Sequence, residues 1–128
     1  MPTKTVKISE ANVQRAICDL LSAKKIRYHR MNAGDRLMES KGKTYRIRGH
    51  EKGCGDILAL VNTGARVTWP LYATRPVILP LYIEVKRPGG KQSAEQWDFE
   101  TAVNAYGCGY LLADSIDVVV EWLEERGL

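Results

Sequence analysis

One stretch of the sequence, residues 81–113, restricts the fold more than any other. Residues 81–86 have the pattern of a strand, residues 93–106 have the pattern of a helix, and residues 109–113 form an apolar run typical of a buried strand. Two strands joined by a helix lie parallel in one sheet, with a right-handed connection. The sequence therefore predicts an α/β fold in which helices cover a central sheet.

Local signals mark the start and the end of the helix in this unit. The sequence Arg-Pro-Gly-Gly at 87–90 ends the first strand, and Ser93 followed by Gln96 fits a capping box. The expected apolar stripe of the helix is Trp97, Ala102 and Val103. After the second strand, Asp114 or Ser115 can cap a last helix.

The N-terminal part adds a helix and further strands. Ser9 is a favourable N-cap, and the apolar residues after it recur at helical spacing up to about Lys25. Residues 26–32 have the pattern of a strand. The basic, glycine-rich segment 34–53 allows a hairpin that turns near residues 40–43.

Residues 56–80 contain several turn signals. Residues 56–61 form an apolar strand, and Asn62-Thr63-Gly64 predicts a turn into a returning strand near residues 66–69. Prolines at positions 70, 76 and 80 predict an interruption before the strand at residue 81, because proline removes a hydrogen bond of the ladder.

The length and composition favour a single folded domain, residues 1–128. A chain of 128 residues with 45% hydrophobic and 27% charged residues can bury one modest core. Three separate cysteines without a CxxC pair indicate reduced thiols, and His50 with Cys54 lacks a second pair of zinc ligands. Charges interrupt the N-terminal segment, and no stretch approaches the roughly 20 apolar residues of a membrane span. We expect a soluble, cytoplasmic protein.

Charge is distributed unevenly along the chain. Residues 24–52 contain ten basic and three acidic residues, whereas residues 92–128 contain eight acidic residues and one basic residue. A basic face would attract phosphate groups, although the two segments can also be solvated faces without a partner. The candidate nucleic-acid-binding residues are Arg36, Lys41, Lys43, Arg46, Arg48, Arg87 and Lys91.

Three charged residues form the candidate chemical site. Glu84 and Lys86 share one face of their strand because side chains alternate along it; alone, this pair also fits an exposed edge strand. Asp56 heads the preceding apolar strand after a Gly-Cys-Gly turn, from which its carboxylate can stand beside Glu84. Two converging carboxylates favour a cation such as Mg²⁺, to which the Val85 carbonyl could add an oxygen. With Lys86 acting on the attacking water, this chemistry is metal-assisted phosphodiester hydrolysis.

The set of residues resembles the PD-(D/E)xK nucleases, and among them the virus-type replication-repair nuclease (VRR-NUC) domain. The match covers nearly the whole chain: Glu10 early in the first helix, Gly-Cys-Gly-Asp56, Glu84-Val85-Lys86, a Pro-Gly turn, and Gln96 one turn into the next helix. The resemblance implies a restriction-endonuclease-like αβββαβ core, with a central mixed sheet flanked by helices.

The resemblance also implies roles for individual residues. Asp56 and Glu84 would bind Mg²⁺ or Mn²⁺, Lys86 would be the catalytic lysine, and Gln96 would support the site. Glu10 would contribute to the metal site directly or through water, or it is simply an acid favoured by the helix dipole.

Two features depart from the family pattern. Gly55 stands where the family name has proline, but glycine also permits a sharp turn into the strand. The 28 positions between Asp56 and Glu84 imply an extended hairpin. The extension, which includes Trp69, Tyr72 and Arg75, can contact DNA, form a dimer interface, or pack as a small core over the sheet.

Stand-alone VRR-NUC proteins resemble archaeal Holliday-junction resolvases. The resemblance implies a homodimeric endonuclease of phage or bacterial origin that cuts branched DNA such as a four-way junction, because opposed strands require two symmetrically placed sites. Two other functions remain open from the sequence: a non-catalytic DNA-binding module of the same fold, and a scaffold protein that binds neither metal nor DNA.

Overall fold

The computed structural model of the protein describes residues 7–31, 36–47, 53–68 and 73–128. The elements in chain order are α1 (Glu10–Ala23), β1 (Arg27–Arg30), β2 (Arg36–Ser40), β3 (Lys43–Ile47), β4 (Ile57–Thr68), β5 (Thr74–Val85), α2 (Ala94–Ala105), β6 (Gly109–Ala113) and α3 (Ile116–Glu124). No helix in these ranges is long and apolar enough to cross a membrane.

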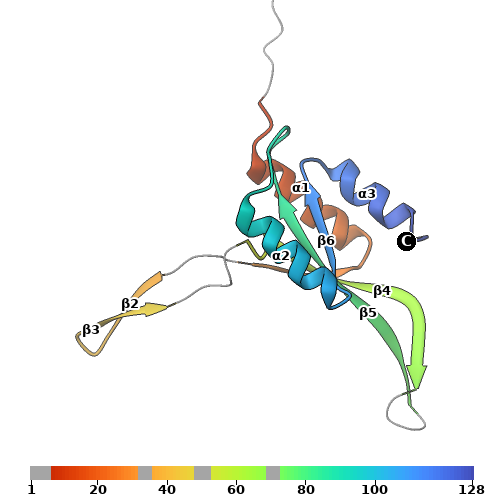
Figure 1. Cartoon of the computed structure of the whole chain (residues 1–128), viewed down its shortest axis with the longest axis horizontal. Helices are drawn as coiled ribbons and strands as arrows, with labels where there is room; N and C mark the ends of the chain where they lie inside the picture. The colour runs from red at the N-terminus through yellow and green to blue at the C-terminus, as the bar shows by residue number, and fades with distance from the viewer. Residues whose placement is uncertain (1–6, 32–35, 48–52, 69–72) are drawn as a thin grey trace, which may run out of the picture.

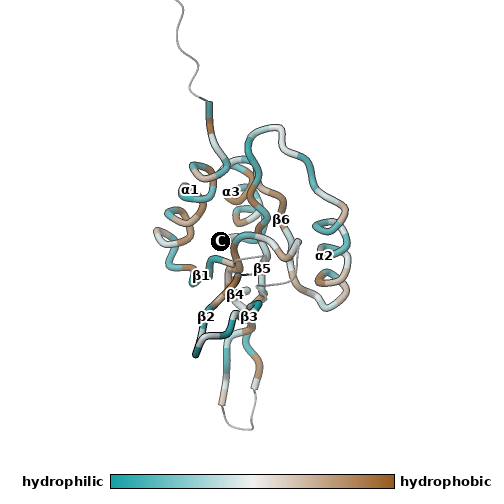
Figure 2. Tube along the Cα trace, turned by 90° about the vertical axis from the view of Figure 1, so that its left-hand side faces the viewer, coloured by the Kyte–Doolittle hydropathy of each residue, from teal (hydrophilic) through white to brown (hydrophobic). Residues whose placement is uncertain are grey.

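The described elements form an α/β fold with a four-stranded mixed sheet, in the order β1-β4-β5-β6 (Figure 1). β1 and β5 lie antiparallel to β4, whereas β6 lies parallel to β5, as the crossover pattern predicts. Helices α1 and α3 cover one face of the sheet and α2 lies on the other, which is clearest in Figure 2. The strands β2 and β3 form a separate hairpin that projects from this body.

The main hydrophobic core lies between the sheet and the two helices α1 and α3. Its fully buried members include Ile17, Leu21, Ile57, Ile83 and Leu123. Burial of each such side chain contributes about 1.5–3 kcal/mol. Ser9 caps α1 by accepting a hydrogen bond from the Asn12 N–H, so the predicted start of this helix is confirmed.

A second, smaller cluster lies under α2. It consists of Cys54, Phe99 and Tyr110, and the Phe99 ring packs edge-on against Tyr82 at 5.0 Å between ring centroids. The predicted stripe of α2 is wrong in part, because Trp97 is 58% exposed and Ala102 is also exposed, while Phe99 is buried. This helix therefore contacts the sheet through a narrow face.

The segment Asn62-Thr63-Gly64 is a bulge rather than the predicted turn. β4 continues through it to Thr68, and its register with β5 shifts between Asn62 and Arg66. The Gly64 N–H donates to the Asn62 side chain, and the Thr63 hydroxyl donates to the Val77 carbonyl. Side-chain hydrogen bonds thus pair backbone groups that the bulge leaves outside the regular ladder, and the chain continues without reversing.

The prolines at 76 and 80 do not interrupt the strand as predicted, because β5 runs from Thr74 to Val85. Val85 N–H and the Ile83 carbonyl both point toward the β4 side. By alternation, the even-numbered residues of β5 point their N–H positions away from β4, and β6 pairs with β5 only from Leu81 onward. Pro76 and Pro80 therefore remove donors that would face an open edge.

The β2–β3 hairpin turns where the sequence predicts it. Ser40 pairs with Lys43, and the two residues between them, Lys41 and Gly42, have φ angles of 51° and 75°. Positive φ at both central positions is the geometry of a type I′ turn, which suits the twist of a two-stranded hairpin. The predicted strand at 26–32 is observed as Arg27–Arg30, and α3 begins after Ser115 without a side-chain cap.

Candidate active site

The loop that carries Asp56 is built by two glycines. Gly53 and Gly55 have φ angles of 87° and 96°, which other residues rarely adopt. A Cβ atom on Gly53 would lie 2.6 Å from the Glu95 carbonyl oxygen, so this loop touches the backbone at the start of α2. The φ of Gly55 also excludes proline, whose φ is fixed near −65°. Backbone geometry therefore explains the glycine at the position where the family name has proline.

We predict that Gly53→Ala destabilises the protein by roughly 3 kcal/mol, because strained φ and a backbone clash add together. The matched control is Gly107→Ala: Gly107 has a φ of 83° but no atom within 4 Å of its Cβ position. That variant should lose only about 1 kcal/mol. Urea unfolding of both variants measures the difference. Equal losses would show that the close approach to α2 is unimportant.

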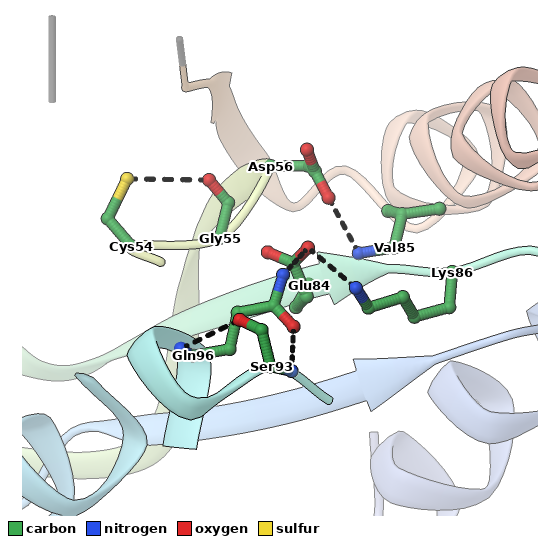
Figure 3. Close-up of polar contacts among 8 residues, drawn as sticks. All are labelled: Cys54, Gly55, Asp56, Glu84, Val85, Lys86, Ser93 and Gln96. Atoms are coloured by element: carbon green, nitrogen blue, oxygen red, sulfur yellow. Dashed lines mark hydrogen bonds and ion pairs between the residues drawn. The ribbon is translucent and has the colours of Figure 1, made fainter. Parts of the chain in front are cut away.

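Asp56 is fixed by the neighbouring strand. Its Oδ2 accepts a hydrogen bond of 2.8 Å from the Val85 N–H, and its own N–H donates to the Ile83 carbonyl at 2.8 Å. The Val85 carbonyl lies on the same side of β5 as its N–H, because both groups of a strand residue point the same way. The start of β4 and the end of β5 thus meet at one place, as Figure 3 shows.

Glu84 is the buried acid of the site, with 7% of its surface exposed. Burial, and next the charge of Asp56, raise the pKa of the Glu84 carboxyl from 4.5 to about 7, while Lys86 opposes this shift. A buried carboxylate repelled by a second, half-buried carboxylate forms a pair of oxygen donors that a divalent cation neutralises. The residues present therefore fit a hard cation such as Mg²⁺.

Lys86 stands beside Glu84 at the end of β5. The Nζ atom of Lys86 lies 3.8 Å from Oε1 of Glu84, and its backbone N–H donates to the Ala113 carbonyl at 2.8 Å. The side chain of Lys86 is largely buried, with 18% exposed, so its charge acts at short range in a poorly solvated place. The structure brings together Asp56, Glu84 and Lys86, as predicted from the sequence.

Gln96 links α2 to the buried acid. Its Oε1 accepts from the Ser93 N–H at 2.8 Å within the predicted capping box, and its Nε2 donates to Oε1 of Glu84 at 2.6 Å (Figure 3). One side chain thus completes the helix cap and orients the carboxylate. The structure therefore brings Gln96 to the predicted site, and its supporting role in catalysis stays a prediction.

Glu10 lies at the start of α1 and is exposed. The negative charge of Glu10 raises the pKa of Glu84, but it is the smallest of the contributions that do so. Within residues 7–31, 36–47, 53–68 and 73–128, no group of three or more His, Cys, Asp or Glu side chains is close enough to hold a metal. The carboxylates that converge are therefore the pair Asp56 and Glu84.

Tyr110 is a neighbour of the site that the sequence pattern did not single out. In the sequence, Tyr110 is only one residue of a predicted apolar strand. In the structure, its hydroxyl is buried in the small cluster under α2. Burial, and next the charge of Glu84, raise the pKa of Tyr110. A phenol that stays protonated adds no further negative charge to the carboxylate pair.

The candidate nucleic-acid contacts lie on two parts of the molecule. Lys41, Lys43 and Arg46 are exposed on the β2–β3 hairpin, while Arg87 and Lys91 are exposed in the connection between β5 and α2. The side chain of Arg36 and the whole of Arg48 lie outside the described residues, as do Trp69, Pro70 and Tyr72.

A pocket of about 330 Å³ lies at the start of the connection that follows Lys86. It is lined by Lys7, Ile8, Arg87, Pro88 and Gly89. Lys7 was not among the predicted binding residues, because a single lysine before a helix carries no signal. Two cations in one pocket are suited to an anionic group such as a phosphate.

Comparison with known proteins assigns neither a family nor a function to the chain. No model of a known protein family matches the chain, and no curated protein matches it.

Proposed function

We propose that the protein is a metal-dependent DNA endonuclease with a restriction-endonuclease-like core of the VRR-NUC type. The observation that carries the proposal is the meeting of Asp56, Glu84 and Lys86 where β4 begins and β5 ends, with Glu84 buried and held by Gln96. If the inserted β2–β3 hairpin is set aside, the order of elements up to β6 is α1-β1-β4-β5-α2-β6, and α3 follows; this order is compatible with the αβββαβ pattern of that core.

The proposed reaction is hydrolysis of a phosphodiester bond. Asp56 and Glu84 would hold Mg²⁺ or Mn²⁺, with the Val85 carbonyl as a further oxygen donor. The bound cation would supply charge neutralisation at the scissile phosphate and a lowered pKa of water. Asp56 is held in its orientation by the Val85 N–H, so little reorganisation is needed on binding.

Lys86 is the group that acts on the reacting atoms. Its ammonium group would donate to a nonbridging oxygen of the scissile phosphate and orient the attacking water. Gln96 keeps Glu84 in place through the 2.6 Å hydrogen bond, so it is a positioning residue. The pocket with Lys7 and Arg87 would hold a neighbouring phosphate of the same strand.

Branched DNA is the proposed substrate, with a homodimer as the acting form. One chain offers one such site, whereas cutting two opposed strands of a four-way junction requires two. The β2–β3 hairpin, with Lys41, Lys43 and Arg46 exposed, would contact DNA phosphates. We also propose a cytoplasmic location, where cellular or phage DNA is accessible.

The test is incubation of the full chain with end-labelled four-way junctions, flaps, nicked duplexes and linear duplexes. With Mg²⁺ or Mn²⁺ we expect scission, and with EDTA none, because the carboxylate pair would act on the phosphate and the attacking water only through the cation that it holds. Binding that depends on salt, without scission in either metal, would instead favour a DNA-binding module. If the protein shows no binding to DNA and no scission of it, the proposed function is contradicted.

A further inference from the structure

The outer half of the β4–β5 hairpin is a two-stranded ribbon that no described element covers. β1 pairs only with Ile57–Leu60 of β4, and β6 pairs only with Leu81–Val85 of β5. The ribbon, defined here as residues 62–68 and 74–78, curves away from the body in Figure 1. Residues 62–68 are all exposed, so this part of the hairpin does not pack as a small core over the sheet.

An isolated two-stranded ribbon is marginally stable in water. A ribbon of this length is therefore expected to gain stability from a binding partner. Its exposed apolar side chains, Val67 at 45% and Ile78 at 41%, add a further cost without burial. Local hydrogen bonds hold the two strands in register: Arg66 donates from Nη2 to the Thr74 carbonyl at 3.2 Å. The two strands are thus held together while their side chains stay exposed, and such a surface is suited to binding a partner.

The composition of the ribbon selects the kind of partner. Between Asp56 and Glu84 the sequence contains no acidic residue, and Arg66 and Arg75 give the ribbon two positive charges. Pro76 and Pro80 remove N–H donors from the open edge of β5, which disfavours the addition of a further strand from another protein. A cationic ribbon with two prolines along the open edge of β5 fits a polyanion better than a strand-adding protein.

The shape of the ribbon is compatible with duplex DNA, because the major groove admits a two-stranded β-ribbon. The ribbon and Glu84 belong to the same strand. Arg75 and Glu84 are nine positions apart, which at about 3.3 Å per residue is at most about 30 Å. This distance corresponds to about nine base pairs at 3.4 Å each.

We infer that the ribbon binds a duplex arm of the DNA substrate up to about nine base pairs from the bond that is cut. The inference rests on the proposed nuclease function and adds a requirement to it: the substrate must carry double-stranded DNA on the ribbon side. Arg66 and Arg75 contribute contacts to phosphates, and the curved hairpin sets the distance between these contacts and the site.

The experiment varies the DNA arm and the ribbon together. Junctions with arms of 6, 10 and 14 base pairs are cut by the wild type and by the double variant Arg66→Gln/Arg75→Gln. For the wild type we expect cleavage of the shortest arm to be about tenfold slower than that of the longest, since about two phosphate contacts are lost. The double variant should cut all three lengths at the slow rate.

The matched control removes two exposed charges elsewhere, Arg15 of α1 and its C-cap Lys24, with Arg15→Gln/Lys24→Gln, and should keep the dependence on arm length. Binding in EDTA provides a readout that does not need cleavage. The slope of log K against log salt concentration should become shallower by about 2 in the ribbon variant, provided that thermal melting shows it folded.

The outcomes separate the two proposals. Cleavage by the wild type that is independent of arm length would overturn the ribbon assignment and leave the nuclease function intact. Absence of cleavage with every DNA would contradict the nuclease function, while the salt slopes in EDTA would still decide the ribbon. If the ribbon variant instead changes the sedimentation of the protein and not its salt slope, the ribbon is a contact between copies, and the assignment is wrong.

Discussion

Glu84→Gln is expected to reduce Mg²⁺-dependent cleavage by about a thousandfold. The substitution keeps the size of the side chain and a possible contact with Gln96, but it removes one of the two carboxylates that would hold the cation. Loss of several kcal/mol of charge stabilisation at the phosphate corresponds to about three orders of magnitude in rate. Single-turnover cleavage of a labelled four-way junction measures the effect.

The controls for this prediction separate chemistry from folding and binding. Glu121→Gln removes an exposed acid from α3 and should leave the rate unchanged. DNA affinity in EDTA should be equal or higher for Glu84→Gln, because a negative charge is lost near the phosphates. Wild-type rates for Glu84→Ala or Lys86→Ala would sink the assignment of this site as the place of catalysis.

The second large effect is on stability, and it has the opposite sign. In the folded, metal-free protein the pKa of Glu84 is raised to about 7, from an ordinary 4.5. The folded state therefore binds this proton more tightly than the unfolded state. The stabilising contribution is complete below pH 4.5 and is lost as the pH rises through 7. The loss is on the order of 3 kcal/mol.

The comparison that isolates this contribution is between the wild type and Glu84→Gln in EDTA. The glutamine is neutral at every pH, so the stability of the variant relative to the wild type should increase between pH 4.5 and 7.5. Adding Mg²⁺ at pH 7.5 should shrink the difference, because the cation would stabilise the ionised carboxylate only in the wild type. A difference that stays constant across this pH range would show that Glu84 titrates normally.

The opposite signs of these two effects have one physical cause. A buried carboxylate next to Asp56 costs stability when no cation is present, as its raised pKa indicates. The same crowding of negative charge would attract a divalent cation to the end of the sheet. Residues that destabilise a fold and bring functional groups together are expected at active sites.

Much of the scaffold follows from local sequence signals. Ser9 and the Val13, Ile17 and Leu21 stripe define α1, and the capping box of Ser93 and Gln96 defines the start of α2. These features depend on residues three or four positions apart, which share a helix face or form a capping hydrogen bond between a side chain and the backbone. They are legible in the sequence because both partners lie in the same short window.

Signals in the β4–β5 hairpin were misleading for a reason that is not local. Asn62-Thr63-Gly64 has the composition of a turn, but pairing with β5 on both sides of it converts the segment into a bulge. Pro76 and Pro80 look like strand breakers, yet the missing N–H groups face an edge that β6 does not reach. In both cases the outcome depends on where another strand lies.

The candidate site divides in the same way. Strand alternation and the position of Asp56 after Gly-Cys-Gly by themselves determined that Asp56, Glu84 and Lys86 could meet, because the period of a strand fixes which side chains share a face. The packing of the elements was needed to show that Glu84 is buried, that Gln96 reaches it, and that neither β1 nor β6 covers the outer part of the extended hairpin. Burial and long-range contacts depend on how α2 and the unequal strands pack together, and no short window of sequence contains that information.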